Sequence, residues 1–286
     1  MLSANPVRRA AAASAAIGIS ALIAGCGSSG SSSSATSKAA TTSPPATTSA
    51  SATTSASATS SASATPTGGS NPTVLAAASL TKVFPMIDPN ARYSFGGSGA
   101  LATEIEQGAP ADVYAAASPK DPAMLYAKKL VTKPVEFATN TLVLIVPNGN
   151  PAHITSVMDI TKKGVKLVIC NATVPCGDYA RTAFANLGIT TAAMKNVVSQ
   201  TTDVTQTVAE VATGQADAGF VYITDADAAK GKVKVVRLPA AAKPGTEDFI
   251  AVVKSTKNPT AAKAFVATVL SAKGQAALKA AGFGKS

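Results

Sequence analysis

The fold is inferred from the stretch VLAAASL at residues 74–80. Its run of small apolar residues is typical of a buried strand, and it ends at Ser79, a residue type that favours the start of a helix. A strand that ends in this way brings a hydroxyl group together with several unpaired backbone N–H groups, which suits an anion. We therefore expect a strand over 74–78, a short helix over 80–87 and a ligand contact at Ser79.

Strand and helix signals alternate after this stretch, which predicts an α/β fold with mostly parallel sheets. Pro85 is expected to shorten or distort the first helix, because proline removes a backbone donor. The other expected strands are 92–95, 112–116, 141–146, 165–170, 218–223, 233–238 and 250–254. The other expected helices are 100–107, 122–129, 177–187, 204–213 and a terminal pair over 259–281, broken at Lys273 and Gly274.

The segment after residue 72 has roughly 215 residues, which is enough for one large domain or for two lobes of about 100 residues each. The turn sequence PNG follows the buried strand 141–146, so the chain can cross between lobes there, and the strand 233–238 can carry it back. We assign residues 73–145 and 236–286 to lobe 1 and residues 146–235 to lobe 2.

The N-terminal residues 1–25 have the layout of a bacterial export signal, because Arg8 and Arg9 precede a stretch rich in Ala, Ile and Leu. The end of that stretch, LIAGC, resembles a lipobox, in which Cys26 becomes the lipidated N-terminus after cleavage. A plain signal peptide or an uncleaved helix is the alternative. We expect an extracytoplasmic protein held by lipid to the outer face of the cell membrane, in an oxidising compartment.

Residues 26–72 are almost entirely Ser, Ala and Thr, and such a segment buries too little apolar surface to order itself. We expect a disordered linker there. The formal charge of +10 falls to +7 after this point, because 22 of the 25 Lys and Arg residues and all 15 Asp and Glu residues follow it. The charge is scattered, without a basic run or interleaved aromatic residues. This pattern argues against nucleic-acid binding and is compatible with weak steering of a small anion.

Four stretches besides AAASL place a hydroxyl or exposed amides where a strand ends or a helix begins. They contain Ser98 in FGGSGAL, Cys176 in PCG, Val204 after Asp203, and Tyr222 in GFVYITDA. In open α/β sheets, ligands lie beyond the carboxyl ends of the strands, so the five stretches predict one shared cleft. Each stretch by itself is better explained by ordinary helix capping, so the prediction depends on all of them together.

Catalytic and metal chemistry find little support in the sequence. His153 is the single histidine and lies in a loop rich in Pro and Gly, which predicts an exposed position. No G-x-S-x-G motif, clustered metal ligands or complete dinucleotide fingerprint is present. We expect no enzyme activity and no cofactor. Cys170 and Cys176 are expected to form a disulfide in an exported chain, the alternative being a free reactive thiol.

Five motifs in order resemble those of the substrate-binding lipoprotein of ATP-driven molybdate importers. Between residues 73 and 282 they are AAASL, FGGSGALATEIEQGAPADVYAAAS, VPCGDYAR, TDV before a helix, and GQADAGFVYITDA. The resemblance implies a two-lobed type II periplasmic-binding-protein fold with a hinge, closing on molybdate or tungstate. Its implied oxyanion contacts are the hydroxyls and amides of Ser79 and Ser98, the backbone amides of Cys176 and Val204, and the hydroxyl of Tyr222.

The same resemblance implies the membrane subunits of an ABC permease as partners, and we expect a monomer. The segment between AAASL and the second strand is shorter than is usual in the family, which puts the packing of that face in question. Three other functions stay open: a receptor for sulfate or another tetrahedral oxyanion, an enzyme on the same bilobal fold, and a surface lipoprotein without a transport role.

Overall fold

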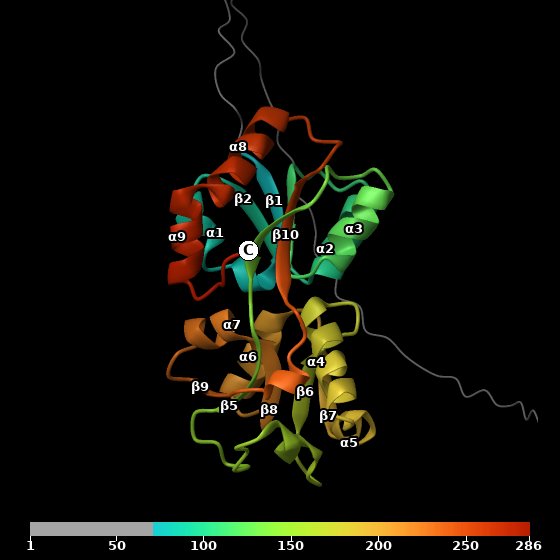
Figure 1. Ribbon diagram of the computed structural model, residues 1–286, viewed down its shortest axis with the longest axis vertical. Helices are drawn as coiled ribbons and strands as arrows, with labels where there is room; N and C mark the ends of the chain where they lie inside the picture. Colours follow the sequence, from blue (N-terminus) through green and yellow to red (C-terminus); the bar gives the residue numbers. More distant parts are fainter. Residues whose placement is uncertain (1–70) are drawn as a thin grey trace, which may run out of the picture. The chain divides into compact units, whose positions relative to one another are not determined.

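Two five-stranded sheets form the framework of residues 71–286, which are the residues that the computed structural model describes (Figure 1). The expected export signal, the lipidation site Cys26 and nearly all of the expected linker lie outside the described residues. Within residues 71–286, no helix is both long enough and apolar enough to cross a membrane.

The first sheet has the strand order β2-β1-β3-β10-β4. Strand β1 pairs in parallel with β2 and β3, whereas β10 pairs antiparallel with β3 and β4. The bounds are β1 Thr73–Ala77, β2 Arg92–Gly96, β3 Val113–Ala116, β4 Val135–Thr139 and β10 Glu247–Val252.

Helices cover both faces of the first sheet. Figure 1 shows α1, α8 and α9 on one side of it, and α2 and α3 on the other. Their bounds, with the 3-10 helix η1, are η1 Ala78–Leu80, α1 Phe84–Ile87, α2 Ser98–Glu106, α3 Lys120–Ala127, α8 Pro259–Leu270 and α9 Ala272–Ala280.

The second sheet repeats this plan with the order β7-β6-β8-β5-β9. Strand β6 is parallel to β7 and β8, and β5 runs antiparallel to β8 and β9. In each sheet, four strands therefore run in one direction and one inner strand, β10 or β5, runs against them. The strands are β5 Leu142–Pro147, β6 Leu167–Cys170, β7 Val197–Thr201, β8 Ala218–Tyr222 and β9 Val233–Val236. The helices are η2 Val157–Thr161, α4 Pro175–Asn186, α5 Thr190–Lys195, α6 Val204–Ala212, α7 Ile223–Ala228 and η3 Ala240–Ala242.

The chain passes between the sheets twice, and both passages differ from the expected lobe boundaries. Strand β5, whose first residues we assigned to lobe 1, lies wholly in the second sheet, so the first passage is at Asn140. Strand β9 also belongs to the second sheet, and the return passage comes just before β10. The two passages are hydrogen-bonded to each other, since the amide N–H of Asn140 donates to the carbonyl of Thr246 (2.8 Å). The PNG turn that suggested the boundary instead ends a strand within the second sheet.

Local structure after β1 differs from the expected single helix. Ala77 is the N-cap residue of η1, and Ser79 lies inside this 3-10 turn without capping it. Pro85 is tolerated because it occupies the first turn of α1, where its missing N–H would have no partner inside the helix. The break in the terminal helix pair falls at Ser271 rather than at Lys273. The elements β4, α5, β7 and α7 were not expected from the sequence.

The short segment after β1 is packed by aromatic rings. The ring of Phe84 lies 5.5 Å from that of Phe265, 5.8 Å from that of Phe137 and 6.3 Å from that of Tyr93, measured between centroids. Phe84 is completely buried, and such ring pairs stabilise a core beyond the area they bury. That face of lobe 1 is therefore packed, although the segment is short.

Candidate functional site

A small cavity of about 10 Å³ lies where the carboxyl ends of strands from both sheets meet. All five residues that the sequence predicted as oxyanion contacts line it. Its other lining residues were not predicted as contacts and include Gly97, Ala117 and Asp203. The complete lining is Ala77, Ala78, Ser79, Gly96, Gly97, Ser98 and Ala117 from lobe 1, with Val174, Cys176, Asp203, Val204 and Tyr222 from lobe 2.

Ser79 presents a hydroxyl without a partner. It lies two residues after the end of β1, and its Oγ atom is buried and makes no hydrogen bond within the described protein. Because the residue lies in the first turn of η1, backbone N–H groups beside it also lack acceptors inside the helix. A buried polar atom is normally hydrogen-bonded, so this hydroxyl has the character of a ligand contact.

Ser98 is the first residue of α2, with Gly97 as the N-cap residue. Its Oγ accepts a hydrogen bond from the backbone N–H of Ala117 (3.2 Å), and its carbonyl accepts one from the hydroxyl of Tyr114 (2.8 Å). The hydroxyl proton of Ser98 thus remains available for donation while its oxygen is fixed. Ala117 is a neighbour that sequence reasoning missed, because it follows β3 and carries no polar side chain.

Cys176 and Val204 bring backbone amides to the cavity. Cys176 is the second residue of α4 and Val204 the first of α6, so both N–H groups belong to the turn that has no acceptor inside its helix. Asp203 caps α6 by accepting a hydrogen bond from the backbone N–H of Gln206 (3.0 Å). Two helix N-termini with their partial positive charges therefore point at the cavity from lobe 2.

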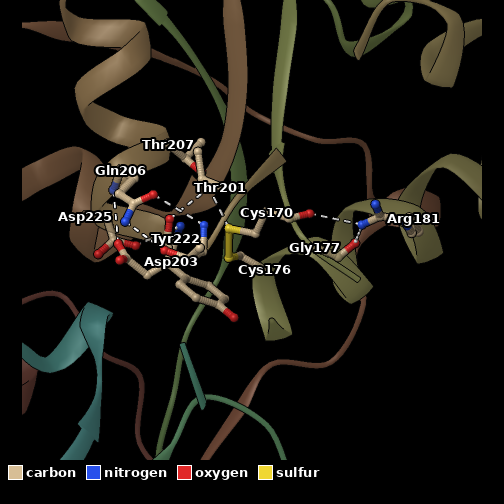
Figure 2. The surroundings of a disulfide bond; sticks show 11 residues. Cys170, Cys176, Gly177, Arg181, Thr201, Asp203, Gln206, Thr207, Tyr222 and Asp225 are labelled. Atoms are coloured by element: carbon tan, nitrogen blue, oxygen red, sulfur yellow. Dashed lines mark hydrogen bonds between the residues drawn. A yellow bond between two sulfur atoms is a disulfide. The ribbon is translucent and has the colours of Figure 1, made fainter. Parts of the chain in front are cut away.

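The loop that holds Cys176 is closed by a disulfide to Cys170, which confirms the expected pairing. Figure 2 shows Arg181 on one side of this bond and Tyr222 on the other. One guanidinium nitrogen of Arg181 donates to the carbonyls of Cys170 (3.1 Å) and Gly177 (2.9 Å). The disulfide and the guanidinium fix the backbone from which the Cys176 amide projects, and such preorganisation lowers the cost of binding.

Tyr222 ends β8, and its ring packs edge-on against that of Tyr179 with the centroids 6.4 Å apart. Its backbone N–H donates to the carboxyl of Asp225 (3.1 Å), while its own hydroxyl is buried without a partner in the described protein. In Figure 2 the ring extends away from Asp203 and Asp225. Burial raises the pKa of the Tyr222 hydroxyl well above its usual value, so it acts as a neutral donor.

Neutral groups dominate the cavity. No Lys or Arg side chain is among the described residues that line it, and Asp203 is the single charged residue there. Nearby Asp225 has its pKa raised to about 7, chiefly by burial. Burial likewise raises the pKa of Asp248 well above its usual range. The arrangement can hold an anion through oriented O–H and N–H donors and helix termini, without a counter-charge.

His153 lies outside this site. It is exposed in a loop and is absent from the cavity lining, as the sequence predicted. Among residues 71–286, no group of three or more His, Cys, Asp or Glu side chains is arranged to hold a metal ion.

A family model accounts for most of the described chain. Residues 88–284 match the model of the bacterial extracellular solute-binding proteins, which is more than half of the sequence. The chain belongs to this family. The match includes strands of both sheets and both interlobe passages, and it begins after β1 and Ser79.

Related proteins in this family include the molybdate-binding protein ModA of Mycobacterium tuberculosis, which is 40% identical over 222 residues and aligns with 74% of this chain and 84% of its own length. Two solved structures share the fold. The periplasmic molybdate-binding protein of Azotobacter vinelandii has a TM-score of 0.66 at 24% identity and covers 74% of this chain and 98% of its own. The sulfate-binding protein SubI of M. tuberculosis has a TM-score of 0.63 at 20% identity and covers 75% of this chain and 86% of its own.

Proposed function

We propose that this protein binds molybdate outside the cytoplasm and delivers it to the membrane subunits of an ABC permease, with tungstate as a second ligand. The observation that supports this most strongly is the convergence of Ser79, Ser98, Cys176, Val204 and Tyr222, from both lobes, on one cavity. The 40% identity to a protein named for molybdate binding favours molybdate among the tetrahedral oxyanions.

Neutral donors suit this ligand for a physical reason. A dianion accepts charge-assisted hydrogen bonds, which are roughly twice as strong as neutral ones, so several fixed donors can replace its hydration shell. A cage without a mobile Lys or Arg also has a fixed size. It therefore favours oxyanions of one radius, and we expect the smaller sulfate to bind more weakly than molybdate.

A sulfate receptor is the alternative within this class, and the likeness to SubI supports it at the level of the fold. An enzyme is less well supported, because acid–base catalysis needs a titratable group at the reacting atoms. Asp203 is the one such group in the cavity lining besides Tyr222, and its carboxylate accepts the Gln206 N–H as a helix cap. We propose a binding protein without cofactor or catalytic activity, acting as a monomer.

Delivery, as distinct from binding, is tested by uptake in cells. We expect cells that lack this protein to take up labelled molybdate more slowly at low external concentration, and the intact chain to restore uptake. A chain with both Ser79→Ala and Ser98→Ala should not restore it. Normal uptake in the deleted strain, with no other importer present, would favour a surface lipoprotein without a transport role.

Replacing Cys26 by Ala is expected to release the protein from the membrane fraction without changing its affinity for molybdate. The reason is that lipid would attach at this residue, and a segment of roughly 45 residues rich in Ser, Ala and Thr would separate it from the cavity. The measurement is fractionation followed by a carbonate wash, with ligand titration of the released protein. A variant that stays in the membrane would show that the leader itself acts as the anchor.

Affinity for molybdate is expected to fall as the pH rises through about 7, where Asp225 loses its proton. The neutral carboxyl does not oppose a dianion, whereas the carboxylate beside Tyr222 repels it, so binding is linked to proton uptake. Because the folded-state pKa is raised, the stability of the ligand-free protein should also fall between about pH 4 and 7 and then level off.

Calorimetric titrations at pH 6 and pH 8 test this linkage. Asp225→Asn should remove most of the pH dependence of affinity, and the matched change Asp227→Asn, at an exposed position on the same helix, should leave it in place. Equal pH dependence in the wild type and in Asp225→Asn would assign the linkage to another group.

A further inference from the structure

Gly97 and Gly99 contact the backbone of the opposite lobe. They flank Ser98 at the start of α2 in lobe 1. A Cβ atom added to Gly97 would lie 2.5 Å from the carbonyl oxygen of Thr202, and one added to Gly99 would lie 2.3 Å from that of Thr173. Both distances are far below van der Waals contact, and both partners are backbone atoms, which cannot move aside as the end of a side chain can.

Neither glycine is required by its own lobe. Gly97 has φ −66° and ψ 131°, which any residue adopts, and Gly99 lies within the first turn of α2, where alanine is the better helix former. The three nearest atoms to each added Cβ atom belong to Thr202, Val174 and Thr173 of lobe 2. The absence of a side chain at these positions thus has a consequence only when the lobes are together.

We propose that Gly97 and Gly99 are positioning residues that permit the two lobes to close on the ligand. A methyl group at either position would hold the lobes apart by about 1 Å, because a carbon–oxygen contact needs more than 3 Å. Ser98 lies between the two glycines, so the same displacement draws its hydroxyl away from the Cys176 and Val204 amides. Hydrogen bonds weaken steeply over such a distance, and the cage would be left incomplete.

The test uses full-length Gly97→Ala and Gly99→Ala, with Gly149→Ala as the matched control, because a Cβ at Gly149 meets no atom within 4 Å. We expect both cleft variants to lose about 5- to 150-fold in molybdate affinity, and the control to lose none. The melting temperature of the ligand-free protein should be unchanged in Gly97→Ala, and unchanged or slightly raised in Gly99→Ala. Unchanged affinity in both cleft variants would overturn the proposal. A fall in ligand-free stability as large as the loss of binding free energy would overturn it as well.

A second measurement does not depend on the proposed ligand. Lys120 and Asp178 form an ion pair across the lobes (3.7 Å) through exposed side chains, so cysteines at these two positions can be bridged by a short bis-maleimide when the lobes close. We expect bridging in the ligand-free protein to be about 5- to 150-fold slower with Gly99→Ala than without it. Equal rates would contradict the role in closure even if molybdate proves not to be the ligand, which separates this proposal from the proposed function.

A different observation concerns the route to the cavity. A groove of about 750 Å³ shares Ala78 and Ser79 with the cavity and extends between α6, α7 and α9. Four exposed lysines line it, Lys82, Lys230, Lys232 and Lys279, and none of them forms an ion pair within residues 71–286. Asp225 and Asp227 also line the groove, so the four lysines outnumber the two carboxyl groups there.

Carboxyl groups gather on the other side of the cleft, where Lys120 pairs with Asp178. After the larger effect of burial, the pKa of Tyr179 is raised there by Glu247, Asp248, Asp178 and Asp121. Figure 1 places α3 and α4, which carry Asp121 and Asp178, on the opposite side of the molecule from α7 and α9. The geometry points to the lysine-lined groove as the entrance of the oxyanion, with the lysines accelerating its association.

Stopped-flow association of molybdate tests this route, which rests on the proposed function. We expect Lys82→Gln with Lys279→Gln to lower the association rate constant about 3- to 10-fold at low salt, to leave the dissociation rate unchanged, and to lose its effect at high salt. The control is Lys163→Gln with Lys195→Gln, two exposed lysines outside the groove. An unchanged association rate would contradict the route alone, whereas a wild type that binds no oxyanion would contradict the proposed function as well.

Discussion

Replacing Ser79 by Ala is expected to weaken molybdate binding by about 10- to 150-fold. The variant removes the one hydroxyl that is buried beside η1 without a partner, and a charge-assisted hydrogen bond of this kind contributes about 1.5 to 3 kcal/mol. Ser98→Ala and Tyr222→Phe should cost a similar amount. Isothermal titration of each variant with molybdate gives the values.

Two substitutions serve as controls for the hydroxyl variants. Val204→Ala should have a mild effect, because its backbone amide is the group expected to bind, and His153→Ala should have none, because that residue is exposed outside the cavity. Full affinity in both serine variants, or a large loss in His153→Ala, would place the binding site elsewhere.

Gly177→Ala is expected to lower the stability of the ligand-free protein by about 3 kcal/mol, which corresponds to a melting temperature about 5–10 °C lower. The added Cβ would lie 2.1 Å from the carbonyl oxygen of Asn171 and 2.3 Å from that of Cys170. These atoms belong to the same lobe, so α4 must shift whether or not the lobes are closed. Affinity should fall too, because the Cys176 amide moves with the helix.

Thermal unfolding without ligand checks this result. Gly149→Ala is again the control, and Gly99→Ala is the informative comparison, because it has a similar clash but only with the opposite lobe. If Gly177→Ala has the same melting temperature as the wild type, the disulfide loop adapts to the methyl group.

The convergence of the five candidate residues on one cavity could be predicted from the sequence, because these residues lie where strands end and helices begin. Short apolar runs that stop at Ser, Gly or Asp mark such junctions locally, and parallel strands place their carboxyl ends at one edge of a sheet. Ser79 shows the limit of this reasoning. Its residue type predicted a helix cap, but the cap residue is Ala77, which leaves the Ser79 hydroxyl free for a ligand.

Other features depend on contacts between distant parts of the chain. Strand β5 is apolar throughout and fits either sheet by composition, so its membership of the second sheet is decided by pairing with β8 and β9. The strands β4 and β7 carry mixed polar and apolar residues and gave no clear periodic signal. The roles of Gly97 and Ala117 likewise appear only when chain segments meet in space.

The central claim is that neutral donors from both lobes bind one tetrahedral dianion, and the most direct test is isothermal titration of the chain from Gly69 onward. The titrants are molybdate, tungstate, sulfate and phosphate. We predict one site per chain that binds molybdate and tungstate tightly and sulfate more weakly. Absence of heat with molybdate, or sulfate binding as tight as molybdate binding, would contradict the claim.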